Sequence, residues 1–197
     1  MPDPSYPAGD MEDEQLLERC RNGDGDAFEA LLERHQSACF GLAVRILGDR
    51  DEAMDALQDS CIKAWRGIGD QRGGSFRSWM NSIVARTCLD RIRTRRPQLA
   101  LVDEEDRVIP LLDPSPGPES SALSRERIRA IERGLSLLTP EHRAVILMRD
   151  LSGMSYEEIA ASLEVPVGTV RSRLARARSG LQAELLRLDP KILEAYA

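Results

Sequence analysis

Several features that mark other classes of protein are missing from this sequence. No run approaches the roughly 20 apolar residues of a transmembrane helix, and the acidic first 13 residues contain no basic-then-apolar signal peptide. Aromatic residues make up 4% of the chain and runs of β-branched residues are few, which argues against a β-rich fold. We therefore expect a soluble, cytoplasmic and mostly helical protein.

Metal ligands and catalytic groupings are scarce as well. The four cysteines are 19, 22 and 27 residues apart and form no CxxC pair, and only two histidines are present. The sequence contains no Walker loop and no pairing of a histidine with a cysteine nucleophile, so nothing indicates an enzyme, a metal site or a cofactor. We expect isolated buried thiols in a reducing compartment. The cysteines are Cys20, Cys39, Cys61 and Cys88, and the histidines are His35 and His142.

Negative charge is in excess overall, but it is unevenly distributed. The net charge of −6 combines −9 over residues 1–64, +6 over 65–96, −5 over 97–124 and +3 over 125–187, with −1 in the last ten residues. Two basic segments therefore lie within an acidic chain, and the mean charge does not exclude a nucleic-acid partner.

The clearest boundary is the segment 97–121. It contains four consecutive acids and then four prolines within nine residues, and prolines at this density exclude a regular helix or a central strand. The sequence therefore predicts an all-α protein of two small helical domains, residues 12–96 and 122–188, joined by an extended linker.

Capping and helix-breaking residues predict four helices in each domain. Asp49 and Ser75 are expected to cap two helices of the first domain. In the second domain Thr139 precedes a proline at a helix start, and Ser155 forms a capping box with Glu158. The predicted helices are 13–21, 26–47, 50–66 and 76–96, then 124–137, 141–151, 156–163 and 167–186.

The strongest local pattern is SYEEIAASLEVPVGTVRSRLARAR, residues 155–178. Two short helices joined at residues 164–166 have the length and apolar spacing of a helix-turn-helix. One arc of the second helix must face the core: Val167, Val170, Leu174, Ala177 and Leu181. The opposite arc carries hydrogen-bond donors and no acid: Gly168, Thr169, Ser172, Arg173 and Arg176. Arg171 and Arg178 flank the apolar arc.

These donors are suited to DNA. Arginine can bond a guanine edge with two donors, serine and threonine fit either base, and the remaining arginines can hold phosphates. The alternative is a solvated basic helix in an all-α domain.

The helix predicted over residues 50–66 also has two contrasting faces. One arc is apolar and is expected in the core: Ala53, Met54, Leu57, Cys61, Ala64 and Trp65. The opposing arc is acidic: Asp51, Glu52, Asp55 and Asp59. Ile62 projects among these acids with Gln58 beside it, which suits a partner surface with a small hydrophobic anchor, whereas the alternative is a solvated face.

The helix predicted over residues 76–96 combines a core face with a basic polar face. The core face is Phe76, Met80, Ile83, Val84 and Thr87. The polar face is Ser78, Ser82, Arg86 and Arg93, with Trp79 at its edge, and Arg91, Arg95 and Arg96 make the helix end basic. An aromatic ring beside such a face can stack on an unpaired base while arginines follow the backbone. The alternative places Trp79 in the core as a filler.

Taken in order, three stretches resemble a bacterial extracytoplasmic-function (ECF) sigma factor. They are DRDEAMDALQDSCIKAWRGI, FRSWMNSIVARTCLDRIRTRR and, after the proline-rich linker, LLTPEHRAVILMRDLSGMSYEEIAASLEVPVGTVRSRLARAR. The resemblance covers about residues 12–188. It implies a sigma-2 domain that binds the clamp of core RNA polymerase and opens the −10 element. It also implies a sigma-4 domain that reads the −35 element and docks on the flap of the β subunit.

The resemblance also assigns candidate site residues. The clamp-binding helix is matched by Asp51, Asp55, Leu57, Gln58, Asp59 and Ile62. Residues 67–75 match the loop that captures a flipped −10 base, and Trp79 matches the aromatic residue of the melting helix. The −10 candidates are Gly73, Ser75, Trp79, Ser82, Arg86 and Arg93. The −35 candidates are Thr169, Arg171, Ser172, Arg173, Arg176 and Arg178. Thr87 stands where the family commonly has asparagine, which leaves the preferred −10 sequence open.

A helix-turn-helix repressor or activator is the alternative class of protein. It would account for the C-terminal motif, but not for the acidic helix with Ile62 or the basic helix with Trp79, and it would bind DNA without polymerase. The resemblance further implies control by an anti-sigma factor that occludes both domains, and such a partner could hold the protein at the membrane.

Overall fold

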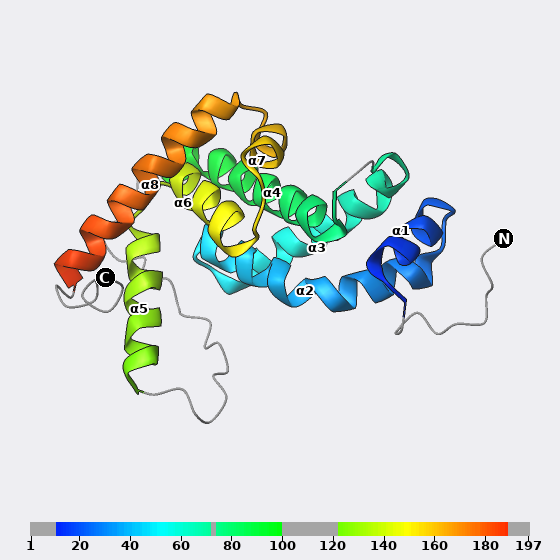
Figure 1. Ribbon diagram of the computed structural model, residues 1–197, viewed down its shortest axis with the longest axis horizontal. Coiled ribbons are helices and arrows are strands. Elements are labelled where there is room, and N and C mark those ends of the chain that lie inside the picture. Colours follow the sequence, from blue (N-terminus) through cyan, green and yellow to red (C-terminus); the bar gives the residue numbers. More distant parts are fainter. Residues whose placement is uncertain (1–10, 72–73, 100–121, 189–197) are drawn as a thin grey trace.

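The computed structural model describes residues 11–71, 74–99 and 122–188, and for residues 96–99, 122–127 and 188 it describes the backbone alone. Every regular element within these ranges is helical, which confirms the predicted all-α fold (Figure 1). The elements are α1 (Asp13–Arg21), α2 (Gly25–Leu47), α3 (Arg50–Gly67), the 3-10 turn η2 (Ile68–Asp70), α4 (Phe76–Leu99), α5 (Ala122–Ser136), α6 (Pro140–Ile146), the π-helical turn η3 (Leu147–Leu151), α7 (Tyr156–Leu163) and α8 (Val167–Leu188).

Capping side chains determine where several helices begin. Asp24 and Asp49 each accept a hydrogen bond from the backbone N–H three residues later, at 3.1 and 2.9 Å. Ser155 and Glu158 form the predicted capping box at the start of α7, with bonds of 3.1 and 2.7 Å. Each bond satisfies an N–H group that has no partner within the helix. The predicted helix starts are confirmed to within two residues.

One predicted helix end is wrong. α4 was expected to end at Arg96, but its backbone remains helical through Pro97 to Leu99. A proline in a helix leaves the carbonyl four residues earlier without its usual donor. That carbonyl belongs to Arg93, which is exposed, so water can take the place of the missing donor. The rest of the predicted linker, residues 100–121, lies outside the described residues.

Helices α1 to α4 pack around a shared core, with α2 in contact with each of the other three. Phe76, Met80, Val84 and Thr87 are buried and Ile83 is half-buried, as predicted for the core face of α4. The largest fully buried side chains of this part are Leu16, Leu17, Leu31, Leu42, Ile46, Phe76, Met80, Val44 and Val84.

Helices α5 to α8 form the second part, in which α8 packs against α5, α6 and α7. Val170, Leu174 and Ala177 are buried, while Val167 and Leu181 are half-buried against the core. This confirms the apolar arc predicted for the second helix of the helix-turn-helix.

The two predicted domains are packed against each other and share a single continuous hydrophobic cluster. In Figure 1, α6 and α7 lie beside α4, and α5 and α8 meet at the end of the molecule away from α1. Polar contacts reinforce this packing. Arg45 of α2 forms an ion pair of 2.8 Å with Glu132 of α5, whose side chain is buried.

A buried arginine adds a second polar contact between the two parts. Arg143 of α6 donates to the carbonyl of Ile46, in the last turn of α2, at 3.1 Å. It also donates to the carbonyls of Ser136 and Leu138, at 2.7 and 2.9 Å. Burial lowers the pKa of Arg143 to about 10. The guanidinium therefore joins the end of α2 to the α5–α6 connection.

Candidate nucleic-acid interface

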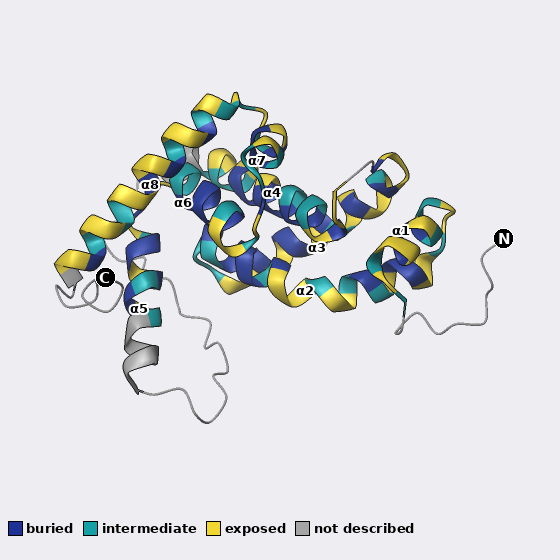
Figure 2. Ribbon diagram, in the orientation of Figure 1, coloured by how far each residue is buried: buried dark blue, intermediate teal, exposed yellow. Residues whose placement is uncertain are grey.

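The outward face of α8 is the candidate surface for duplex DNA. Ser172 and Arg176 are exposed one turn apart, and Thr169 and Arg173 are half-buried beside them. The Ser172 hydroxyl donates to the Thr169 carbonyl at 3.0 Å, which leaves its oxygen lone pairs available as acceptors. Figure 2 shows the exposed residues of α8 along its outer side. The structure therefore brings together the central −35 candidates on one accessible helix face.

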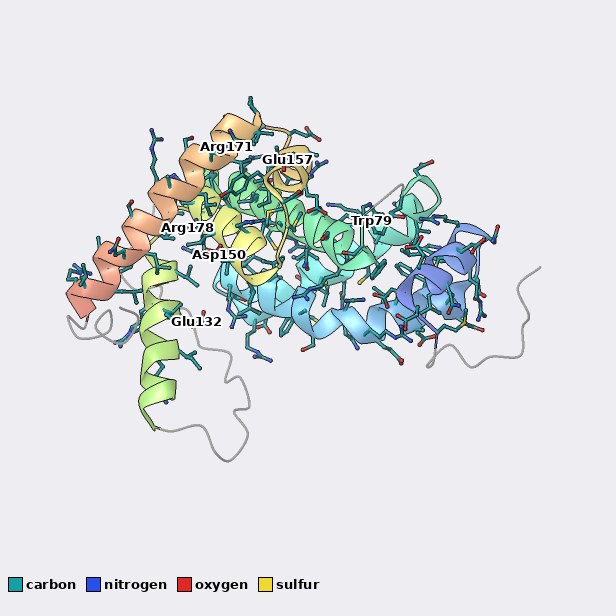
Figure 3. The ribbon with its side chains drawn as sticks, viewed as in Figure 1. Trp79, Glu132, Asp150, Glu157, Arg171 and Arg178 are labelled. Atoms are coloured by element: carbon teal, nitrogen blue, oxygen red, sulfur yellow. The ribbon has the colours of Figure 1, made fainter. Side chains whose placement is uncertain are left out.

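The two flanking arginines of α8 have partners within the protein. Arg178 forms an ion pair of 2.7 Å with Asp150 of η3, and this hydrogen bond raises the pKa of Arg178. Arg171 lies 6.0 Å from the centre of the Tyr156 ring, on which Arg149 also lies, at 5.0 Å. Figure 3 shows Arg178 beside Asp150 and Arg171 nearer the start of α8.

Asp150 is a functional candidate that sequence reasoning missed. The outward arc of α8 contains no acid of its own, but η3 places this carboxylate at the edge of the basic face. The two partners are 28 residues apart in the sequence, so no local pattern signals the pair. A carboxylate next to an arginine lowers the positive potential around it.

The exposed face of α3 carries most of the predicted polymerase-binding residues. Ile62 is 50% exposed among the acids, as expected for a hydrophobic anchor. The other exposed members are Asp51, Asp55, Gln58 and Asp59. Leu57 differs, because its side chain is buried. In this conformation Leu57 supports the helix from the core and does not belong to the exposed face.

The predicted core arc of α3 is partly wrong. Met54 and Trp65 are 46% and 40% exposed, and Cys61 is half-buried. The buried face consists instead of Ala53, Ala56, Leu57, Ser60 and Ala64. Small residues on this face let the neighbouring helices approach closely, so the larger side chains remain outside. Trp65 packs its ring against Phe28, with ring centres 5.1 Å apart.

Arginines of α4 partly neutralise the acidic face of α3. Arg91 lies 2.6 Å from Asp59 and 3.8 Å from Asp55, and Arg95 pairs with Glu52. These pairs lie at or near the surface, where such interactions contribute little stability. A partner that binds the acids of α3 with its own basic groups has to compete with Arg91.

The −10 candidates of α4 are only partly accessible. Trp79 is half-buried, with its ring centre 6.0 Å from that of Phe76, and it packs over Gly67. Ser82 is half-buried, whereas Ser75 and Arg93 are exposed. The Ser75 hydroxyl caps α4 by accepting from the N–H of Ser78 at 3.2 Å. Gly73 lies outside the described residues.

Arg86, in the centre of this basic face, is engaged by the helix-turn-helix. Its guanidinium donates to the carbonyl of Ser162 at 2.9 Å and pairs with Glu164 at 2.9 Å. Ser162 also donates from its hydroxyl to the carbonyl of Ser82, at 3.4 Å. The polar face of α4 therefore lies against the C-terminal end of α7, while the outward face of α8 remains exposed (Figures 2 and 3).

The described residues hold no group of three or more histidines, cysteines, aspartates and glutamates that could bind a metal ion. No helix within the described ranges is long and apolar enough to cross a membrane. Three features of the described residues stand out: the basic helix-turn-helix of α7 and α8, the basic face of α4 with Trp79 at its edge, and the acidic face of α3 with the exposed Ile62.

Two family models match the chain, one in each part. The model described as Sigma-70 region 2 matches residues 31–98, and the model described as Sigma-70, region 4 matches residues 128–181. Together they include the helices that carry all three candidate surfaces.

Similar proteins extend the match over nearly the whole chain. The RNA polymerase sigma-H factor of Pseudomonas aeruginosa is 36% identical over 93% of this chain and 97% of its own length. The ECF RNA polymerase sigma-E factor of Escherichia coli strain K12 is 36% identical over 87% of this chain and 93% of its own. The chain belongs to the ECF sigma factors, which are transcription initiation factors of bacterial RNA polymerase rather than enzymes.

Solved structures show the same fold. CnrH, in complex with the cytosolic domain of CnrY, is 27% identical, with a TM-score of 0.62 over 90% of this chain and 98% of its own. The sigma factor RpoE of Bartonella quintana, in complex with the anti-sigma factor NepR, is 27% identical. Its TM-score is 0.64 over 82% of this chain and 98% of its own.

Proposed function

We propose that residues 12–96 bind core RNA polymerase and open the −10 element, and that residues 122–188 read the −35 element. The observation that carries this assignment is the separation of charge. The exposed face of α3 is acidic around Ile62, whereas the outward face of α8 is basic around Ser172 and Arg176. One surface suits a basic protein partner, and the other suits DNA.

Within the −35 surface, we propose different roles for the arginines. Ser172 and Arg176 enter the major groove together, because both are exposed at the centre of the outward arc. Arg171 and Arg178 lie nearer the protein body and reach phosphates, with Thr169 and Arg173 completing the contact. In the free chain Arg171 lies near the Tyr156 ring, and Arg178 is paired with Asp150.

For the −10 surface, we propose that Trp79 stacks beside an unpaired base and that Ser82, Arg86 and Arg93 follow the strand. The loop from Gly67 to Ser75, with Gly73, takes up a flipped base. Since Arg86 is bonded to α7 in this arrangement, the two parts have to separate before the full −10 surface is available.

For the polymerase, we propose that the exposed residues of α3 dock on the β′ clamp and that the second part docks on the β flap. Residues 100–121, the rest of the acidic, proline-rich segment, would then pass between these two sites. We place the protein in the cytoplasm, where polymerase and promoter DNA are located.

We also propose that an anti-sigma factor controls this chain. Two similar structures support the idea, since one is a complex with the anti-sigma factor NepR and the other a complex with the cytosolic domain of CnrY. A partner of the second kind would hold the protein at the membrane.

The decisive experiment measures promoter recognition with and without core polymerase. The free chain is expected to bind duplex DNA weakly, because its acidic first segment repels phosphate and its basic segments are small.

With polymerase, Arg176→Ala should cost about 1–3 kcal/mol on the preferred −35 sequence and relax preference at one base. Arg178→Ala should weaken all −35 variants alike and lower the salt slope by about one unit. Tight specific binding by the free chain, or an exchange of the two mutant phenotypes, would contradict the assignment.

A further inference from the structure

One tyrosine ring contacts arginines from two different elements of the second part. Tyr156 is the first residue of α7, is half-buried, and packs against the hydrophobic core. The Arg149 guanidinium of η3 lies 5.0 Å from the centre of its ring, and the Arg171 guanidinium of α8 lies 6.0 Å from it. Both distances are within the range of a cation–π interaction. Figure 3 shows Arg171 on α8 and Glu157, the residue next to Tyr156, on α7.

The position of this ring is fixed by contacts on the side of the protein body. The capping box of Ser155 and Glu158, with bonds of 3.1 and 2.7 Å, fixes the start of α7. Arg149 donates to the carbonyl of Met154 at 2.7 Å, and the Met154 side chain is fully buried. The guanidinium that lies on the Tyr156 ring from η3 is therefore itself anchored.

Arg171, in contrast, has few contacts of its own. It is exposed, and its guanidinium forms no hydrogen bond or ion pair with any of the described residues. Arg173 and Arg176, on the same helix, lie over no aromatic ring in the part of the chain that the structure describes. Among the arginines of the outward face, Arg171 is therefore the one whose position depends on Tyr156.

A ring contact of this kind prepares an arginine for a phosphate. A free arginine side chain has many rotamers, and ordering it on binding costs free energy. A ring that already restricts the side chain lowers this cost. The attraction of a guanidinium to a ring face uses none of its five N–H donors, so these donors remain available to phosphate oxygens.

We propose that Tyr156 is a positioning residue for the −35 surface, which holds the Arg171 guanidinium where a DNA phosphate binds it. The inference rests on the proposed phosphate-binding role of Arg171. Tyr156 itself touches no DNA in this scheme. Because phosphate contacts carry no direct sequence information, loss of the ring should weaken binding to all −35 sequences alike.

The test is a double-mutant cycle, in which holoenzyme reconstituted from the full chain and core polymerase binds −35 duplexes. Tyr156→Leu removes the ring and should lower the affinity about threefold, equally for every −35 sequence. Tyr156→Phe keeps the ring and should bind as the unaltered chain does. In an Arg171→Ala background, Tyr156→Leu should cause no further loss, because the side chain that the ring positions is gone.

Two controls separate positioning from stability. In an Arg173→Ala background, Tyr156→Leu should lower the affinity by the same factor as in the unaltered chain, because Arg173 does not contact the ring. Leu163→Ala truncates another half-buried side chain of α7 that packs against the core. Any loss of affinity that Leu163→Ala causes should persist in the Arg171→Ala background.

The outcomes distinguish this inference from the proposed function. If Arg171→Ala binds −35 duplexes as tightly as the unaltered chain, Arg171 holds no phosphate and both proposals are overturned. If Arg171→Ala weakens binding but Tyr156→Leu does not, or if the two losses multiply in the double variant, only the positioning role is wrong. Equal losses in Tyr156→Phe and Tyr156→Leu would mean that the hydroxyl group contacts DNA, which also overturns the positioning role.

Discussion

The Arg86 guanidinium donates to the Ser162 carbonyl across the boundary between the two parts of the molecule. The acceptor lies in the last turn of α7, where helix carbonyls have no partner within the helix. The same side chain pairs with Glu164 just beyond that helix end. A residue proposed to follow the −10 strand therefore acts as a C-terminal cap for the first helix of the helix-turn-helix.

Removal of this contact should loosen the packing of the two parts. Arg86→Ala takes away charge-assisted hydrogen bonds, so the closed arrangement should lose about 1–3 kcal/mol relative to open ones. Small-angle scattering of the free protein should then show a larger radius of gyration. Arg93→Ala is the matched control, because Arg93 is exposed on the same helix and pairs with Asp90 within α4. An unchanged radius of gyration in Arg86→Ala would contradict the idea that Arg86 holds the two parts together.

Arg143 should matter for the stability of the whole chain. Arg143→Ala leaves three carbonyls at the α2, α5 and α6 boundaries without their donor. The free energy of unfolding should fall by about 3 kcal/mol, measured by denaturant titration. Arg176→Ala, at an exposed position, should change it by less than about 0.5 kcal/mol. Equal stability of the two variants would show that the Arg143 bonds add nothing.

Substitutions on α3 should show that exposed residues affect binding to core polymerase, whereas buried residues affect the free energy of unfolding. Ile62→Asp and Asp55→Arg change exposed side chains, so they should weaken binding to core polymerase and alter stability by no more than about 0.5 kcal/mol. Leu57→Ala removes a buried side chain and should cost about 2–5 kcal/mol of folding free energy. Binding and thermal unfolding of the three variants can be measured in parallel. Unaltered polymerase affinity in both Ile62→Asp and Asp55→Arg would remove the clamp assignment.

The carboxylate of Asp150 should lower the affinity of the protein for DNA. Asp150→Asn removes the carboxylate charge that Arg178 faces, so affinity for DNA should rise at low salt and the salt slope should steepen by up to about one unit. The measurement is the binding of −35 duplex by holoenzyme over a range of salt concentrations. Glu157→Gln removes an exposed acid from α7 and should have a smaller effect. A lower affinity in Asp150→Asn would mean that the carboxylate is needed to orient Arg178.

Thiol reactivity should follow burial. Burial raises the pKa of Cys39 and Cys88 to about 12, so at pH 8 both remain protonated and shielded. Cys61 is half-buried and should be alkylated first, as mass spectrometry after iodoacetamide treatment would show. Because unfolded thiols ionise near pH 9, stability should also fall as the pH rises above 9. Alkylation of Cys88 as fast as that of Cys61 would contradict this order.

The structural features that can be predicted most reliably from the sequence are those that depend on residues close together in the chain. The capping box of Ser155 and Glu158 and the apolar arc of α8 are encoded within a few residues of each other, and the structure confirms both. The helix-turn-helix can therefore be predicted from the sequence alone.

Features that depend on distant contacts could not be predicted in this way. Met54 and Trp65 fit an apolar arc by periodicity, but small residues such as Ala56 and Ser60 occupy the buried face of α3. The bond between Arg86 and Ser162 joins residues 76 positions apart. Its presence depends on how α4 and α7 pack, which no local pattern specifies.

The polar contacts between the two parts respond differently to salt than DNA binding does. Arg86 and Arg143 donate mainly to neutral carbonyls at helix ends, and salt screens such contacts less than it screens a pair of full charges. Binding to phosphates, in contrast, weakens steeply as ions are added. A rise in ionic strength should therefore weaken binding to phosphates more than it weakens the hydrogen bonds of Arg86 and Arg143 between the two parts.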